Sequence, residues 1–180
     1  MDTSNPPTPS SPGDGRYIRL LKRVYASAKK ARFLSILSQA AVMLTVLCYG
    51  CLMYFGFAES TVRGFTVLAL TALPFGVLSI IRRLLPSRRP YELYDFPSLG
   101  IPVPKDKKGS SFPSRHVFSA FIIGGILIPF SPILGGVTLA LGIGIALCRV
   151  LLGIHFLRDV VAGAIAGAFA AIIADLILFL

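Results

Sequence analysis

Long uncharged apolar runs separate the charged residues of this chain into clusters, and no other feature constrains its fold as strongly. No Asp, Glu, Lys or Arg occurs between Arg115 and Arg149. Runs of this kind match the thickness of a bilayer, whereas a soluble protein needs charged residues distributed over its whole surface. The hydrophobic fraction of 54% and the mean hydropathy of +0.76 support the same interpretation. The sequence therefore predicts an all-α fold, a polytopic transmembrane helical bundle.

The predicted spans follow from the lengths of these runs. Residues 33–57 and 61–81 are each long enough to cross about 30 Å of hydrocarbon. One helix over residues 116–148 would be roughly 50 Å long at about 1.5 Å per residue, so this run is expected to fold back as two short helices. The break is expected at Pro129-Phe130-Ser131-Pro132, because proline lacks the backbone donor that continues a helix. A last span over residues 158–180 brings the expected number of crossings to about five.

The N-terminal segment differs in composition from the spans. Residues 1–15 are rich in Pro, Ser and Thr, which predicts a disordered tail without a cleavable signal peptide. Residues 16–32 place apolar side chains at helical i, i+3 and i+4 spacing, with Lys and Arg between them. This pattern predicts a basic amphipathic helix that lies among the lipid headgroups. The transmembrane domain is then expected over residues 33–180.

The net charge of +10 raises the question of a nucleic-acid partner. The basic residues flank apolar spans and no nucleic-acid-binding motif accompanies them, so the predicted partners are the bilayer with its anionic headgroups and a phosphorylated substrate. Cys48, Cys51 and Cys148 lie in apolar surroundings and lack a second ligand pair for zinc. We interpret them as packing residues.

Two long polar connections, residues 82–116 and 149–159, interrupt the spans, and the five expected crossings place both on the same side of the membrane, because two of the crossings lie between them. Phosphoryl transfer needs positive charge and hydrogen-bond donors around three non-bridging oxygens, and a planar guanidinium group can hold two oxygens at once. Arg82, Arg89 and Arg149 would form such a phosphate cradle, and Ser114 would add a donor. The two connections are therefore candidate catalytic loops.

The only two histidines of the chain also lie in these connections. His155 and Asp159 are one helical turn apart, so the carboxylate can fix the tautomer of a nucleophilic imidazole. His116, with a pKa near neutrality, can donate a proton to a departing alkoxide. The residue types fit a phosphatase that uses a histidine nucleophile.

Three pieces of the sequence carry a family resemblance. They are Arg82-x6-Arg89-Pro90, Phe112-Pro113-Ser114-Arg115-His116 and Cys148-Arg149-x5-His155-x3-Asp159. In order, spacing and placement between spans they resemble the three signatures of the type 2 phosphatidic acid phosphatase superfamily, which read Lys-x6-Arg-Pro, Pro-Ser-Gly-His and Ser-Arg-x5-His-x3-Asp. The resemblance covers residues 82–159.

The resemblance implies a metal-independent lipid phosphatase without a cofactor, and it implies a role for each matching residue. His155 would attack phosphorus and become phosphorylated, Asp159 would orient it, and His116 would protonate the leaving group and then help water to release phosphate. The expected phosphate-binding residues are Arg82, Arg89, Ser114, Arg115 and Arg149.

The sequence departs from the family signatures at three positions. Arg82 replaces Lys, which keeps the charge and changes its reach. Arg115 replaces Gly, which either lowers the pKa of His116 or adds a substrate contact. Cys148 replaces Ser, and a thiol is a weaker hydrogen-bond donor than a hydroxyl group.

Several alternatives remain open at the level of the sequence. The substrate is expected to be a polyprenyl pyrophosphate, phosphatidic acid or phosphatidylglycerophosphate, and neither the lipid nor the oligomeric state is fixed. Other functions that fit are a vanadate-dependent haloperoxidase-like enzyme and an inactive membrane scaffold or lipid-binding protein. Every Lys and Arg except Arg63 lies on the side of the candidate loops and the N-terminus, which favours a plasma-membrane protein whose site faces the cytoplasm.

Overall fold

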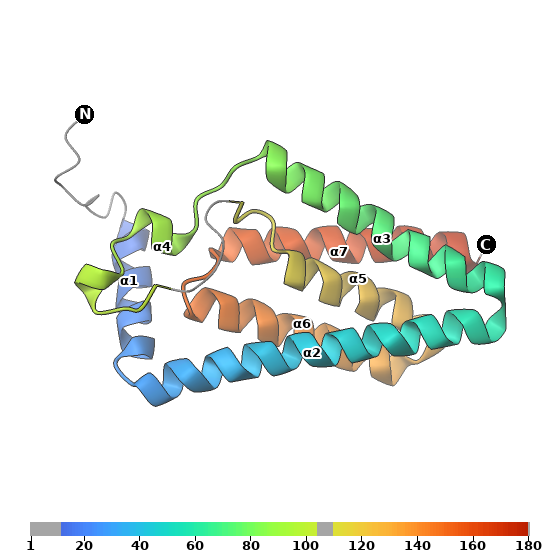
Figure 1. Ribbon diagram of the computed structural model, residues 1–180, viewed down its shortest axis with the longest axis horizontal. Coiled ribbons are helices and arrows are strands. Elements are labelled where there is room, and N and C mark those ends of the chain that lie inside the picture. Colours follow the sequence, from blue (N-terminus) through green and yellow to red (C-terminus); the bar gives the residue numbers. More distant parts are fainter. Residues whose placement is uncertain (1–11, 104–109, 180) are drawn as a thin grey trace.

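The computed structural model describes residues 12–103 and 110–179 (Figure 1). All regular secondary structure in these ranges is helical, which confirms the predicted fold class. The elements are α1 (Pro12–Tyr25), α2 (Ala28–Glu59), α3 (Thr61–Leu84), α4 (Pro90–Leu93), the 3-10 helix η1 (Pro97–Leu99), α5 (Arg115–Phe130), α6 (Pro132–Leu151) and α7 (Leu157–Phe179).

Four helices in the described ranges are long and apolar enough to cross a membrane: α2, α3, α6 and α7. Their outer faces carry large apolar side chains that nothing in the chain covers, among them Phe33, Val62, Leu73, Ile133 and Phe169. Such faces are unfavourable in water, whereas lipid tails solvate them without cost. The exposed surface of the bundle is therefore the surface that contacts lipid.

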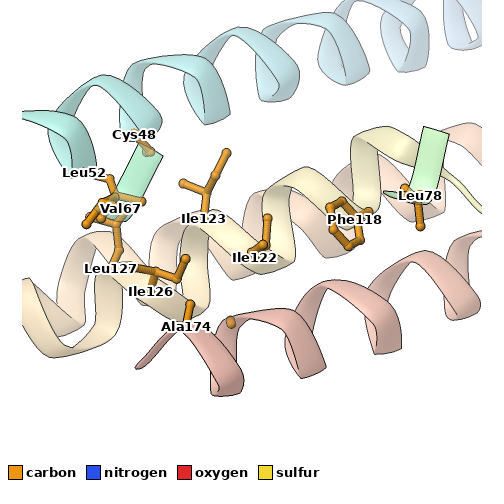
Figure 2. Close-up of a cluster of buried hydrophobic side chains, with 11 residues drawn as sticks. Cys48, Leu52, Val67, Leu78, Phe118, Ile122, Ile123, Ile126, Leu127 and Ala174 are labelled. Carbon is orange, nitrogen blue, oxygen red and sulfur yellow. The ribbon is translucent and has the colours of Figure 1, made fainter. Parts of the chain in front are cut away.

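The central helix α5 has 16 residues, fewer than the four candidate spans. Figure 1 shows it surrounded by α2, α3, α6 and α7. Eight of its residues are buried, and Figure 2 shows Phe118, Ile122 and Ile126 packed in the main apolar core. Protein covers most of α5, so a helix shorter than the four candidate spans can lie in the middle of the bundle.

The predicted hairpin of residues 116–148 is present. Helix α5 ends at Phe130 and α6 begins at Pro132. Between them Ser131 is extended, with φ −154° and ψ 98°, and its hydroxyl group accepts a hydrogen bond from the backbone N–H of Leu134. Proline suits the first position of α6, because a helix leaves that N–H without an internal partner. The hairpin returns the chain to the end of the bundle where α5 begins (Figure 1).

The prediction of one amphipathic helix over residues 16–32 is wrong in its bounds. Helix α1 ends at Tyr25, and α2 begins at Ala28. Ser27 is extended between them, and its hydroxyl group accepts from the backbone N–H of Lys30. Serine is a preferred N-cap, so residues 28–32 start the first long helix instead of ending an interfacial one. Of the predicted tail, residues 1–11 lie outside the described residues, and residues 12–15 belong to α1.

Helix α1 packs against the end of the bundle where the polar connections lie (Figure 1). Leu21 is fully buried in a small apolar cluster with Tyr91, Phe96 and Ile101. The hydroxyl group of Tyr17 donates to the carbonyl oxygen of Val150 at 3.3 Å, and that of Tyr25 donates to Leu152 at 3.2 Å. These contacts hold α1 on the chain that leads from α6 into α7.

Candidate active site

Both polar connections lie at the same end of the bundle, as the crossing pattern predicts (Figure 1). One runs from the end of α3 at Leu84 to the start of α5 at Arg115, and the other joins α6 to α7 over residues 152–156. The backbone N–H of Ser114 donates to the carbonyl oxygen of Asp159 at 2.8 Å, which ties the start of α5 to the first turn of α7. An added Cβ at Gly163 would lie 2.6 Å from the carbonyl oxygen of Ser114, so this close approach requires glycine.

His155 and Asp159 lie together in this contact region. The turn after α6 uses Gly153 at φ 69°, and the backbone N–H of His155 then donates to the carbonyl oxygen of Arg149 at 3.2 Å. The imidazole is 3% exposed and the carboxylate is fully buried. Nδ1 of His155 lies 3.5 Å from Oδ2 of Asp159. The structure thus brings together the pair that the spacing of one helical turn suggested.

A third side chain, Ser111, completes this group, and the sequence reasoning missed it. Its Oγ lies 3.2 Å from Nδ1 of His155, and its hydroxyl group donates to Oδ2 of Asp159. Ser111 is fully buried. It lies outside the family signatures and belongs to no periodic pattern. Its only sequence signal is its place three residues before Ser114, which is too weak to select it.

The surroundings of His155 keep its imidazole neutral. Burial lowers the pKa of His155 from its usual value of 6.5, the hydrogen bond and charge of the Asp159 carboxylate raise it, and the positive charges of Arg89 and Arg149 lower it further. The net direction is downward. A neutral imidazole keeps a lone pair on one ring nitrogen, which is what a nucleophile requires.

His116 and Arg149 form the second group of the site. His116 lies in the first turn of α5, and Arg149 lies in the last turn of α6. Nη2 of Arg149 is 3.4 Å from Nε2 of His116. The hydroxyl group of Ser114, just before α5, is fully buried and has no hydrogen-bond partner within the described residues. The hairpin of α5 and α6 therefore brings the imidazole of His116 and the guanidinium group of Arg149 together, and Ser114 directly precedes the turn that carries His116.

The first signature enters the site through two buried arginines. Arg89 is 5% exposed, and its backbone N–H donates to Oε2 of Glu92 at 2.7 Å, so it caps α4. Arg82 is 6% exposed, and its guanidinium group donates to the carbonyl oxygens of Ser110, Ser111 and Pro113. The structure thus directs Arg82 to the backbone of the loop before α5, whereas the sequence suggested a contact with phosphate.

Arg115 and Cys148 depart from the family signatures and differ in their surroundings. Arg115 is exposed at the start of α5, and Cys148 is buried in α6. Arg115 and His116 line one end of a cavity of about 470 Å³ that follows α5 to Ile123. The rest of its lining is mostly apolar and comes largely from α2 and α3, including Val42, Tyr49, Thr71 and Phe75.

A model of the PAP2 superfamily matches residues 63–179 of this chain, more than half of its 180 residues. The matched region begins in the first turn of α3 and ends with α7, so it contains all three sequence signatures. Helices α1 and α2 precede it. No curated protein sequence matches the chain.

Two crystal structures have a similar fold. The first transmembrane PAP2 type phosphatidylglycerolphosphate phosphatase from Bacillus subtilis aligns with a TM-score of 0.65 and 18% identity, over 93% of this chain and 87% of that one. LpxE from Aquifex aeolicus aligns with a TM-score of 0.66 and 19% identity, over 88% of this chain and 92% of that one. At these identities the likeness establishes a common fold.

Proposed function

This chain belongs to the PAP2 superfamily, and from that premise we propose that it hydrolyses a lipid phosphate monoester or pyrophosphate through a phosphohistidine intermediate. The observation that carries the proposal is the buried His155, which has Asp159 on one side and a pKa lowered by burial and by the charges of Arg89 and Arg149. A neutral imidazole among cations suits attack on an anionic phosphate, because the cations offset its charge.

In the first proposed step Nε2 of His155 attacks phosphorus. A P–N bond forms while the bond from phosphorus to the leaving oxygen breaks, and His116 gives that oxygen its proton. In the second step His116 takes a proton from water, the oxygen of that water attacks phosphorus and the P–N bond breaks. Inorganic phosphate leaves, and both histidines return to their starting protonation states.

The proposed phosphate cradle consists of groups from all three signatures. Arg89, Arg115 and Arg149 would hold the non-bridging oxygens, and the buried hydroxyl group of Ser114 would donate to one of them. We assign Arg82 a different task, because its guanidinium group donates to the loop carbonyls that precede α5. It would set the position of the loop that carries Ser114.

The cavity beside Arg115 and His116 supports a lipid substrate. From Arg115 and His116 it follows α5 for about eight residues, or about 12 Å at the helical rise, away from the polar end of the bundle. Its mostly apolar lining suits an aliphatic tail, while the phosphate would stay among the arginines. We propose the class of polyprenyl pyrophosphates, phosphatidic acid and phosphatidylglycerophosphate as substrates.

We propose that no metal ion takes part in the reaction. Cationic side chains already supply the charge that a metal would contribute to phosphoryl transfer. In the described ranges, no three His, Cys, Asp or Glu side chains come together as a possible metal site.

The proposal is tested on the full chain purified in detergent. Phosphate release is measured from a panel of the lipid phosphates above, from a water-soluble aryl phosphate, and with or without a chelator. We expect long-chain substrates to have the lower KM, the chelator to have no effect, and His155→Ala to lose about 1,000-fold or more in rate. Equal rates for wild type and His155→Ala would leave an inactive scaffold as the better description.

The covalent intermediate is tested in the same preparation. The aryl phosphate needs no proton on its leaving group, so His116→Ala should still form the intermediate and should hydrolyse it slowly. We expect a ³²P label on His116→Ala that survives alkali and is lost in acid, as a phosphohistidine is. A label that persists on the double variant His116→Ala/His155→Ala would rule out His155 as the nucleophile.

We also propose that the site faces the cytoplasm. Arg63 lies at the α2–α3 turn, at the end of the bundle away from the site, and it is the only Lys or Arg of the described ranges at that end. Lys and Arg concentrate in cytoplasmic segments of membrane proteins.

A further inference from the structure

We propose that Ser111 is a positioning residue for His155, resting on the proposed function of the site. Its hydroxyl group donates a hydrogen bond to Asp159, and its oxygen accepts one from Nδ1–H of His155. The imidazole is thereby fixed in the tautomer that leaves the lone pair on Nε2. That nitrogen is the one proposed to attack phosphorus, so Ser111 would act on the reaction without touching substrate.

The donors around Asp159 determine where the protons lie. Oδ2 of Asp159 accepts from the backbone N–H of Phe156 at 3.0 Å and from the hydroxyl group of Ser111. An ionised carboxylate only accepts hydrogen bonds, and a serine hydroxyl group has a single proton. Once that proton points at Asp159, the oxygen of Ser111 presents lone pairs to Nδ1 of His155. Nδ1 must then carry the hydrogen.

The distances make Ser111 the nearer acceptor. Nδ1 of His155 is 3.2 Å from Oγ of Ser111 and 3.5 Å from Oδ2 of Asp159. Hydrogen bonds from N–H to oxygen usually span about 2.7–3.2 Å. The carboxylate therefore acts on the imidazole chiefly through its charge and through the hydroxyl group between them. Two acceptors on the same side also restrict rotation of the ring.

Backbone contacts keep Ser111 in place. Its N–H donates to the carbonyl oxygen of Ser87 at 2.9 Å, and its own carbonyl oxygen accepts from Nη1 of Arg82 at 3.2 Å. Both partners lie at or just beyond the end of α3, and the side chain of Ser111 has no exposed surface. Arg82 of the first signature thus holds the backbone of Ser111, and Ser111 in turn contacts the proposed nucleophile His155. Through this connection Arg82 would help to position His155.

Loss of the hydroxyl group should affect the chemical step more than substrate binding. Without it Asp159 loses a donor and His155 loses its nearer acceptor, so the ring gains access to the tautomer with hydrogen on Nε2. In that tautomer Nε2 has no lone pair with which to attack phosphorus. The free energy of a buried hydrogen bond to a charged group corresponds to a change of about 10- to 100-fold in rate. We therefore expect kcat of Ser111→Ala to fall by about this factor, with KM changed less than about twofold.

The experiment compares Ser111→Ala with Ser111→Thr, which keeps a hydroxyl group, and with Ser98→Ala. Ser98 is an exposed serine in the same connection, and its hydroxyl group donates only to the carbonyl oxygen of Asp95 among the described residues. Phosphate release gives kcat and KM. Nitrogen NMR of protein labelled in histidine gives the tautomer of each ring, and the chain has only two histidines to assign.

We expect the Nδ1–H tautomer of His155 in wild type, in Ser98→Ala and in Ser111→Thr, and a mixture of tautomers in Ser111→Ala. Wild-type kcat in Ser111→Ala, or a fall in kcat without a change of tautomer, would overturn the proposal. If the wild type itself released no phosphate, the proposed function would fail. The tautomer comparison between wild type and Ser111→Ala would still decide the role of Ser111.

Discussion

His155 is neutral because the chain buries its ring at a place where two arginines are nearby. Burial and those charges lower its pKa, and the contact with Asp159 only partly compensates. In the unfolded chain the same side chain takes up a proton near pH 6.5. The contribution of His155 to stability is therefore complete above that pH and is lost as the pH falls through the lower pKa of the folded state. The lowered pKa that suits a nucleophile therefore also makes the fold less stable in acid.

The direction of this shift predicts the pH dependence of the reaction. Protonation of His155 removes the lone pair that we propose attacks phosphorus, so the acid limb of kcat/KM should have its midpoint below pH 6.5. In Asp159→Asn the contributions that raise the pKa of His155 disappear, and the midpoint should move further down while kcat/KM falls about 10- to 100-fold. Profiles of kcat/KM against pH for both proteins check this, and a wild-type midpoint above pH 6.5 would contradict it.

Helix α1 shows how an element outside the matched family region can serve the site. It precedes residues 63–179, yet its Tyr17 and Tyr25 donate to carbonyl oxygens at the end of α6, directly before the turn that carries His155. Leu21 fixes the helix by filling the apolar cluster beside Gly153, where a Cβ would lie 3.3 Å from its side chain. The basic residues of α1 include Arg16, Arg19, Lys22 and Arg23, all exposed and available to lipid headgroups.

Removal of the Leu21 side chain should loosen α1 without unfolding the bundle. Replacing a buried Leu by Ala costs about 2–5 kcal/mol of stability, which is a large part of what can hold one short helix on the bundle. For Leu21→Ala we expect faster trypsin cleavage after the basic residues of α1 and a several-fold loss of phosphate release. Leu20→Ala is the matched control, because Leu20 is the exposed neighbour on the same helix. Identical behaviour of the two variants would mean that α1 does not support the site.

At the scale of the whole molecule, the proposed cytoplasmic site predicts which end of the bundle is accessible from outside the cell. A membrane-impermeant thiol reagent on intact cells should modify Thr61→Cys, at the start of α3, and should not modify Ser98→Cys, near Gly100 in the connection before α5. The wild type measures the background from its own cysteines. Labelling of Ser98→Cys with no labelling of Thr61→Cys would mean that the site faces the outside of the cell, opposite to the proposal.

The sequence alone determined the parts of this protein that depend on local pattern. Hydropathy and run length fixed an all-helical membrane bundle, and the prolines at residues 129–132 fixed the hairpin. The hairpin and the number of crossings then required His116 and His155 to lie at the same end. These features are predictable because the bilayer demands internal hydrogen bonding and a set length from each segment separately.

The tertiary structure decided what depends on contacts between distant residues. The hydrogen bond between Ser111 and His155 joins positions 44 residues apart, and the contact of Arg82 with Ser111 spans 29. The break at Ser27 and the packing of Leu21 also depend on where α1 meets the bundle. The type and position of a serine or an arginine in the sequence do not show which partner its side chain will bond. Only the packing of the helices decides which donors and acceptors come together.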